Sequence, residues 1–66
     1  MNEIVIHYGN EQRIFRRDKN GVIVYDTQAF FGDDGGYPYV TLERDVKAND
    51  KDLKRLLEQV LPKQNI

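Results

Sequence analysis

The strongest local signal in this chain is the dipeptide Asn20-Gly21, which is followed directly by an apolar run from Val22 to Tyr25. Asn-Gly between two strand-like segments predicts a β-hairpin, because a two-residue loop of this kind needs positive φ at both turn residues. The run after the turn does not alternate between apolar and polar residues, so it predicts a strand that is covered on both faces. A single helix can cover only one face of a sheet, and we therefore expect something else to cover the other.

Three further segments have the pattern of strands. Residues 3–8 alternate in polarity, and the turn-like dipeptide Gly9-Asn10 separates them from a second segment. Residues 28–38 are rich in Gly and Asp and predict a loop. Beyond this loop, Val40 and Leu42 fall on one side of a last extended segment. The predicted strands are about 3–8, 12–18, 22–27 and 39–44.

The C-terminal segment predicts a helix over about residues 50–61. Asn49 is a suitable N-cap, and Asp50 and Asp52 add negative charge to the first turn, where the helix dipole favours it. Pro62 ends the segment. Five apolar residues follow the i, i+3, i+4, i+7, i+8 spacing of a single stripe: Leu53, Leu56, Leu57, Val60 and Leu61. We expect this stripe to pack on the chain's own sheet.

Together these elements predict a single α+β domain over residues 1–66, in which an antiparallel meander of three to four strands carries one C-terminal helix on one face. Domains this small usually need disulfides, a metal, oligomerisation or very good packing to be stable. The 66 residues include no Cys and a single His, so disulfides are excluded and a zinc site is not expected. Oligomerisation or binding to another protein is the remaining means of stabilisation.

Two-residue loops at both turns would fix which side chains share a face. Ile4 would lie opposite Phe15, and Arg17 would lie opposite Val24. The face assigned to the helix would then carry Ile4, Ile6, Phe15, Val22 and Val24. The opposite face would carry Val5, Ile14, Ile23 and Tyr25, with a cross-strand ion pair between Glu3 and Arg16. That second face is more apolar than a solvated sheet face usually is.

Aromatic residues flank the Gly-Asp loop. They are Phe30, Phe31, Tyr37 and Tyr39. They could fold back as a lid over the second face or form part of an interface, since aromatic residues are enriched at the centres of binding patches. The predicted protein interface therefore comprises Val5, Ile14, Ile23, Tyr25, Phe30, Phe31, Tyr37 and Tyr39.

The catalytic inventory argues against an enzyme. The chain has no Ser and no Cys, so neither a Ser-His-Asp nor a Cys-His arrangement can form. His7 lies within a strand and is more often a packed or surface residue than a general base. The Gly-rich segment matches no nucleotide-binding motif, and its adjacent Asp33 and Asp34 are better explained as turn residues than as ligands of a divalent cation. We expect no cofactor and no metal.

DNA binding is the alternative function. Four basic residues cluster on the predicted hairpin 13–25: Arg13, Arg16, Arg17 and Lys19. Some DNA-binding domains lay such a sheet in the major groove. The formal net charge is −1, however, and a dedicated nucleic-acid binder usually has a clear basic excess. Acidic neighbours such as Asp18 and Asp26 would neutralise much of the cluster, so the charge balance favours an ordinary surface.

The N-terminus lacks the basic and apolar regions of a signal peptide, and no apolar run approaches membrane-spanning length. The sequence therefore predicts a cytoplasmic protein without membrane contact. The predicted function is that of a non-enzymatic interaction module that forms a homodimer, binds another protein or both. The homodimer would pair through the free sheet face, the aromatic loop or an edge strand. Small cysteine-free proteins of mixed charge often act as accessory or regulatory factors, some of them encoded by phages or mobile elements.

Overall fold

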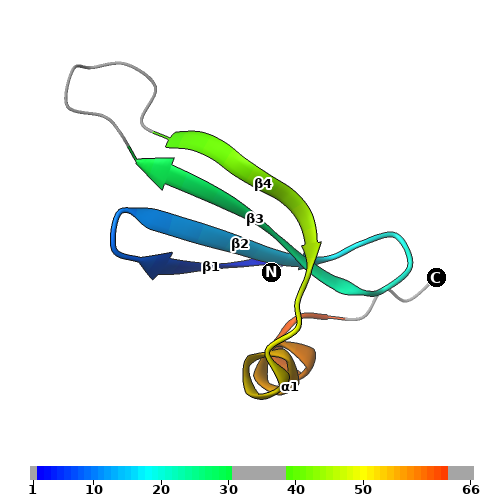
Figure 1. Cartoon of the computed structure of the whole chain (residues 1–66). Helices are drawn as coiled ribbons and strands as arrows, with labels where there is room; N and C mark the ends of the chain where they lie inside the picture. The colour runs from blue at the N-terminus through cyan, green and yellow to red at the C-terminus, as the bar shows by residue number, and fades with distance from the viewer. Residues whose placement is uncertain (1, 31–38, 63–66) are drawn as a thin grey trace.

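The computed structural model describes residues 2–30 and 39–62 of the chain. Its elements are β1 (Glu3–Tyr8), β2 (Glu11–Arg17), β3 (Ile23–Phe30), β4 (Tyr39–Lys47) and α1 (Lys51–Val60). The strands form one sheet in the order β1-β2-β3-β4, and every neighbouring pair is antiparallel (Figure 1). The predicted α+β architecture, an antiparallel meander with a C-terminal helix, is confirmed.

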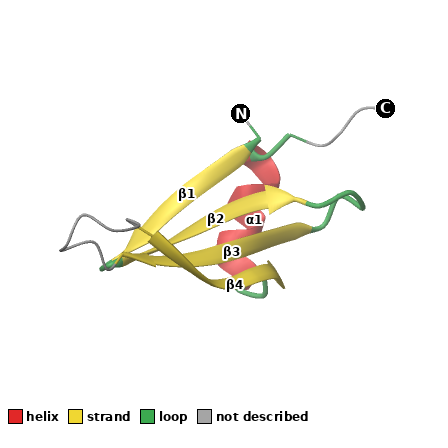
Figure 2. Cartoon of the chain, turned by 90° about the horizontal axis from the view of Figure 1, so that it is seen from above, coloured by secondary structure: helices red, strands yellow, loops and turns green. Residues whose placement is uncertain are grey.

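The molecule has two layers, with α1 crossing beneath one face of the sheet (Figure 2). We call this side the helix face and the other side the open face. The core lies between the layers, where Phe15 and Ile23 are almost completely buried. Ala48, Leu57 and Leu61 complete this cluster, and the half-buried Ile4, Ile6, Tyr25 and Leu53 pack against it. The helix face is therefore the only side of the described sheet on which we find such a cluster.

The β1–β2 connection is the predicted two-residue loop. Tyr8 pairs with Glu11, which leaves Gly9 and Asn10 as the turn. Gly9 has a φ of +61°, while Asn10 does not have positive φ. Positive φ at the first turn position alone is typical of a type II′ turn, in which Gly is favoured there. The predicted pairing of Ile4 with Phe15 follows from this turn and is confirmed.

The β2–β3 connection differs from the predicted two-residue loop. The N–H of Gly21 donates to the Asp18 carbonyl at 2.9 Å, and the Asp18 N–H donates to the Val22 carbonyl at 2.8 Å. Gly21 has a φ of +82°, whereas Asn20 does not have positive φ. This is a three-residue loop, in which a type I turn is followed by a left-handed residue. The Asp18 carboxylate supports it by accepting hydrogen bonds from the N–H groups of Asn20 and Val22.

The extra loop residue shifts the register of β3 by one position. Arg17 lies opposite Ile23 rather than Val24, and Phe15 lies opposite Tyr25. Because side chains alternate along a strand, a slip of one residue moves every side chain to the other face. The predicted faces of β3 are therefore wrong: Ile23 and Tyr25 lie on the helix face, and Val24 lies on the open face.

Substitutions in this turn distinguish the two loop types. Gly21→Ala is expected to lower the free energy of unfolding by about 1–2 kcal/mol, because a β-carbon disfavours the left-handed conformation. Asn20→Ala should change it by only about 0.5 kcal/mol or less, because Asn20 has no positive φ to maintain. Urea denaturation followed by circular dichroism would measure both. Equal losses for the two variants would instead indicate the two-residue loop.

The ends of the elements also differ from the predicted limits. β3 continues to Phe30, into the segment predicted as a loop, and β4 continues to Lys47. The N-cap of α1 is Asp50 rather than the predicted Asn49. Its carboxylate accepts hydrogen bonds from the N–H groups of Asp52 and Leu53, both at 3.1 Å. Capping therefore starts the helix one residue later than expected.

β4 is irregular where it pairs with β3. The register shifts between Tyr25 and Thr27 and again between Thr27 and Gln28. Asp45, at the first shift, has a φ of +54°, and its N–H donates to the Asp26 carboxylate at 3.0 Å. Such bulges bend a strand and increase its local twist. The end of β4 accordingly curves out of the sheet toward α1 (Figure 1).

Candidate interaction surface

One flank of α1 has an apolar surface that the sheet does not cover. Leu57 faces the sheet and is buried, whereas Leu56 and Val60 are each 60% exposed. These two residues are one turn apart, so their side chains lie side by side on the helix. The five-residue stripe predicted from the sequence therefore divides in two. Its centre packs on the sheet, and its edge, which we call the apolar flank, remains open.

A buried arginine contacts one side of the helix. The Arg17 side chain, at the end of β2, is 6% exposed, and its guanidinium contacts a Glu58 carboxylate oxygen at 2.6 Å. It also donates to the Leu61 carbonyl at 3.3 Å and to the Gly21 carbonyl at 2.9 Å. Glu58 is held on the side of α1 next to the β2–β3 turn. At about 100° per residue, Leu56 and Val60 then lie on the opposite side of the helix.

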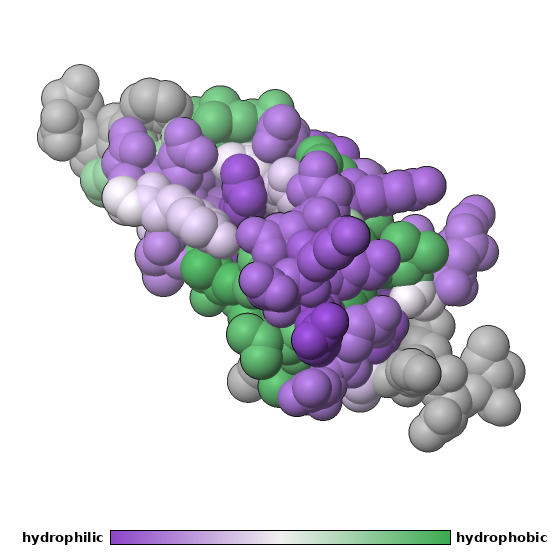
Figure 3. Space-filling model, turned by 60° about the horizontal axis from the view of Figure 1, so that its bottom comes forward, coloured by the Kyte–Doolittle hydropathy of each residue, from purple (hydrophilic) through white to green (hydrophobic). Residues whose placement is uncertain are grey.

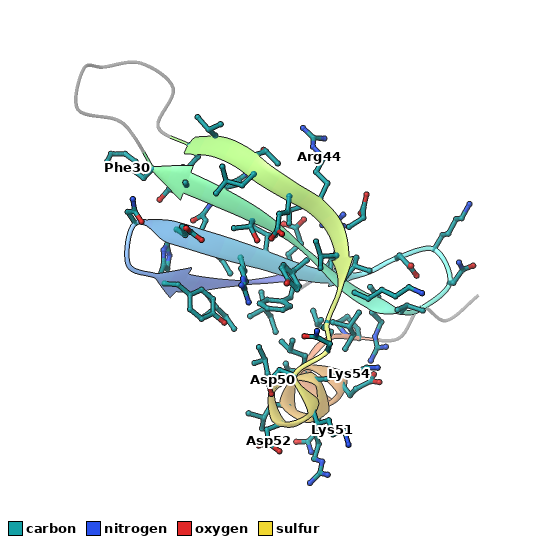
Figure 4. All side chains as sticks on the ribbon, in the orientation of Figure 1. Phe30, Arg44, Asp50, Lys51, Asp52 and Lys54 are labelled. Atoms are coloured by element: carbon teal, nitrogen blue, oxygen red, sulfur yellow. The ribbon has the colours of Figure 1, made fainter. Side chains whose placement is uncertain are left out.

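The apolar flank faces the part of the helix face that α1 does not cover. In Figure 3, hydrophilic residues cover the outer surface of the helix, and hydrophobic residues gather beside it. The polar cover includes Lys51 and Asp52, which lie on the side of α1 away from the sheet (Figure 4). A depression near the start of α1 is lined by Arg13, Phe15, Tyr25, Ala48, Asn49, Asp50 and Leu53.

Arg13 fills the uncovered part of the helix face between two aromatic rings. Its guanidinium carbon lies 5.0 Å from the ring centroid of Tyr8 and 4.7 Å from that of Tyr25. In this arrangement the positive guanidinium is attracted electrostatically to the negative face of each ring. Tyr25 also contacts Phe15, with ring centroids 5.2 Å apart. Arg13 thus packs between aromatic rings on the helix face.

The open face is more polar than the sequence predicted. Val5 and Ile14 pair on this face as expected. Beside them, however, Gln12 donates from its amide to Gln28 at 2.8 Å. Arg16 forms ion pairs with Asp26, at 3.1 Å, and with Asp45, in place of the predicted pair with Glu3. The predicted grouping of Ile23 and Tyr25 with Val5 and Ile14 is therefore wrong, because it depended on the two-residue loop.

The ion pair on the open face affects the ionisation of Asp26. Partial burial of its carboxyl opposes ionisation and would raise the pKa. The hydrogen bond from the Asp45 N–H and the guanidinium of Arg16 oppose this effect and outweigh it. The pKa of Asp26 therefore lies below its ordinary value, so its contribution to stability is lost as the pH falls through that lowered pKa.

The predicted aromatic group is only partly within the described residues. Phe30 and Tyr39 pair across β3 and β4, with ring centroids 5.6 Å apart in an edge-to-face arrangement. Both are exposed at the end of the sheet. With His7 and Glu11 they line an open depression beside the β1–β2 turn. Phe31 and Tyr37 lie outside the described residues.

The basic residues of the hairpin do not form one surface. Arg13 is stacked on the helix face, and Arg16 is paired with carboxylates on the open face. Arg17 is buried against α1, and Lys19 is exposed in the β2–β3 turn. A continuous basic stripe, the usual footprint of a DNA-binding surface, is absent from the described residues.

The two edges of the sheet differ. β1 pairs with β2 without any register shift, and its sequence has no Pro or Lys. β4 has two register shifts and carries Arg44 and Lys47. Irregularity and charge hinder pairing with another strand, so β1 is the more regular of the two edges within the described residues.

Within residues 2–30 and 39–62, no group of His, Asp or Glu is placed to hold a metal ion. In the same ranges, α1 is too short and too polar to cross a membrane.

Sequence reasoning missed the exposure of Leu56 and Val60 and the contact between Arg17 and Glu58. The sequence held no signal for either, because a stripe of this width is typical of a helix that packs on a core. No protein-family model matches the chain, and no curated protein or solved structure is significantly similar to it.

Proposed function

We propose that this chain is a non-enzymatic interaction module that self-associates and acts as an accessory or regulatory protein. The observation that carries this proposal is the amount of apolar surface left open. Eight large hydrophobic side chains among the described residues are exposed, against seven hydrophobic residues that are buried. Isolated exposed apolar residues are normal on a monomer, but adjacent ones beside a half-buried sheet mark an interaction surface.

The energetics of a small domain support the same proposal. A chain of 66 residues has a small core, and without Cys it has no disulfide to reinforce it. Full burial of a Leu or Val side chain stabilises by about 1.5–3 kcal/mol, so covering Leu56 and Val60 would contribute about 1–2 kcal/mol each. Self-association supplies this burial without another component.

The polar groups support a binding role over a catalytic one. His7 is exposed on β1 and lies across from Gln12. The hydroxyl of the buried Thr27 donates to a Glu43 carboxylate oxygen at 3.0 Å. Every buried side-chain N or O atom of the described residues has a hydrogen-bond partner. The buried polar side chains are thus engaged in the fold, and the scattered hairpin arginines give no support to DNA binding.

The proposal predicts that the apparent melting temperature rises with protein concentration and that light scattering gives twice the monomer mass. Leu56→Glu combined with Val60→Glu should raise the dissociation constant at least about tenfold, because charges would replace the apolar flank. The melting temperature at high dilution should stay nearly constant, since both side chains are exposed.

Lys51→Glu combined with Arg55→Glu is the matched control, because it adds the same acidic residues to the outer surface of α1. This variant should associate like the wild type. A chain that stays monomeric at about 200 µM, with a melting temperature independent of concentration, would contradict the proposed function.

A further inference from the structure

The geometry points to a second copy of this chain as the occupant of the β1 edge, in a register centred on Val5. This inference rests on the proposed function and specifies how the two copies meet. β1 is the regular edge of the sheet, and nothing in the described residues pairs with its outer side. An exposed regular edge is a template for an added strand.

The hydrogen-bond pattern shows which backbone groups point outward from β1. The Asp18 N–H bonds to Val22, so the even-numbered residues of β2 bond toward β3. The odd-numbered residues of β2 then bond toward β1, where their partners are Ile4, Ile6 and Tyr8. Bonding direction alternates along a strand, which leaves the N–H and C=O groups of Glu3, Val5 and His7 facing outward.

Symmetry restricts how two such edges pair. Two copies that extend one sheet through the same edge are related by a two-fold axis normal to the sheet. Their strands are antiparallel, and residues that lie opposite each other share a face. Only a register centred on Val5 pairs all the outward-facing residues with one another. It places Val5 against the partner's Val5 and Glu3 against the partner's His7.

The neighbouring registers use the edge less well. Centring on Ile6 would place Glu3 opposite Gly9, which is in the turn. Centring on Ile4 would place His7 opposite the start of the chain, beyond the partner's β1. Each alternative leaves one outward-facing residue without a strand partner.

The side chains are complementary in the same register. On the open face, Val5 meets its own copy at the axis, and the carboxylate of Glu3 lies across from an imidazole. On the helix face, the half-buried Ile4 lies across from the partner's Ile6. Cross-strand pairs of these kinds are favourable. Both helices lie on the same face of the joint sheet. The apolar flank of each helix is directed toward the half of its own sheet that ends at Tyr8. In the dimer, this half of the sheet lies next to the N-terminal end of the partner's β1.

Single cysteines test the register, because the chain has none of its own. In the Val5→Cys variant, the cysteines of the two copies would lie opposite each other across the two-fold axis. Their Cα atoms would be about 5.5 Å apart, a separation that a disulfide accepts. Val40→Cys on β4 is the matched control, because Val40 is 45% exposed and Val5 is 47% exposed. With oxidised glutathione, Val5→Cys should form disulfide-linked dimers at least about tenfold faster than Val40→Cys.

Val5→Pro provides an independent test of the edge. The Val5 N–H points away from β2, so proline removes no hydrogen bond within the monomer but blocks the added strand. This variant should be monomeric by light scattering, while Val5→Ala, which keeps the N–H, should remain dimeric. Circular dichroism would show whether Val5→Pro is folded. If it is not, the oxidation rate of Val5→Cys alone tests the β1 register, because that variant keeps the backbone N–H.

The outcomes separate this inference from the proposed function. A wild-type chain that is monomeric overturns both. A dimer in which Val5→Cys is oxidised no faster than Val40→Cys, or in which a folded Val5→Pro still associates, overturns the β1 register alone. Faster oxidation of Val5→Cys together with loss of association in a folded Val5→Pro establishes it.

Discussion

Phe15→Ala is expected to unfold a large fraction of the chain at 25 °C. Phe15 is 1% exposed and lies in the core, in contact with Tyr25 and in one cluster with the buried Leu57 and Leu61. Replacing a buried Phe by Ala usually costs about 3–5 kcal/mol. Domains of this size have a total stability at the low end of about 5–15 kcal/mol, so the loss is comparable to the whole. Urea denaturation followed by circular dichroism would measure it.

Ile14→Ala is the matched control, because Ile14 is the adjacent residue of β2 and faces the open side. Ile14 is half-buried beside Val5, so truncating it should cost only about 1 kcal/mol. Comparable losses for Phe15→Ala and Ile14→Ala would show that the core is not confined to the helix face.

Arg17→Met is expected to have the second-largest effect, lowering the free energy of unfolding by about 2 kcal/mol. The Arg17 guanidinium connects the β2–β3 turn to the last turn of α1 through Gly21, Glu58 and Leu61. Methionine keeps most of the aliphatic stem and loses every one of these hydrogen bonds. Arg17→Lys should recover little, because an ammonium cannot reproduce the planar fork of donors. Chemical denaturation would measure both variants.

Glu58→Gln separates the ion pair from the rest of the contact. The Glu58 side chain is 44% exposed, so the solvent-screened charge should contribute only about 0.5–1 kcal/mol. Most of the Arg17 effect should therefore remain in Glu58→Gln, through the carbonyls of Gly21 and Leu61. If Glu58→Gln is as destabilising as Arg17→Met, the ion pair and not the carbonyl contacts holds the helix.

Several features of the fold could be predicted because they depend on neighbouring residues. The Gly9-Asn10 turn determined the β1–β2 register, and the spacing of the leucines predicted the helix. Both signals depend on periods of two or about four residues, which a short segment displays completely. The faces of β1 and β2 followed directly from them.

The faces of β3 could not be obtained in the same way, because they depend on the count of loop residues at one turn. Asn20-Gly21 alone is typical of a two-residue loop. The wider sequence Asp18-Lys19-Asn20-Gly21, however, has Asp at the first and Gly at the fourth position, as type I turns favour. The Asp18 carboxylate decides between the two, since its hydrogen bonds form only in the longer loop.

The candidate surface was predicted in part for a related reason. Val5 and Ile14 were correctly paired because their register came from the first turn. The exposure of Leu56 and Val60 depends on the rotation of α1, which is fixed by its contacts with strands that are distant in sequence. Helical spacing shows which residues share a stripe but not where along that stripe the sheet makes contact.

The irregular pairing of β4 has a consequence for the size of any assembly built through the sheet. A molecule with two regular edges could add copies at both ends and grow into a fibril. Here the bulges, the left-handed Asp45 and the charges of Arg44 and Lys47 make the fourth strand a poor template. Pairing through β1 uses the same edge of both copies and leaves only β4 edges outside. Association in this way ends at two molecules, because the irregular β4 edge does not accept a further strand.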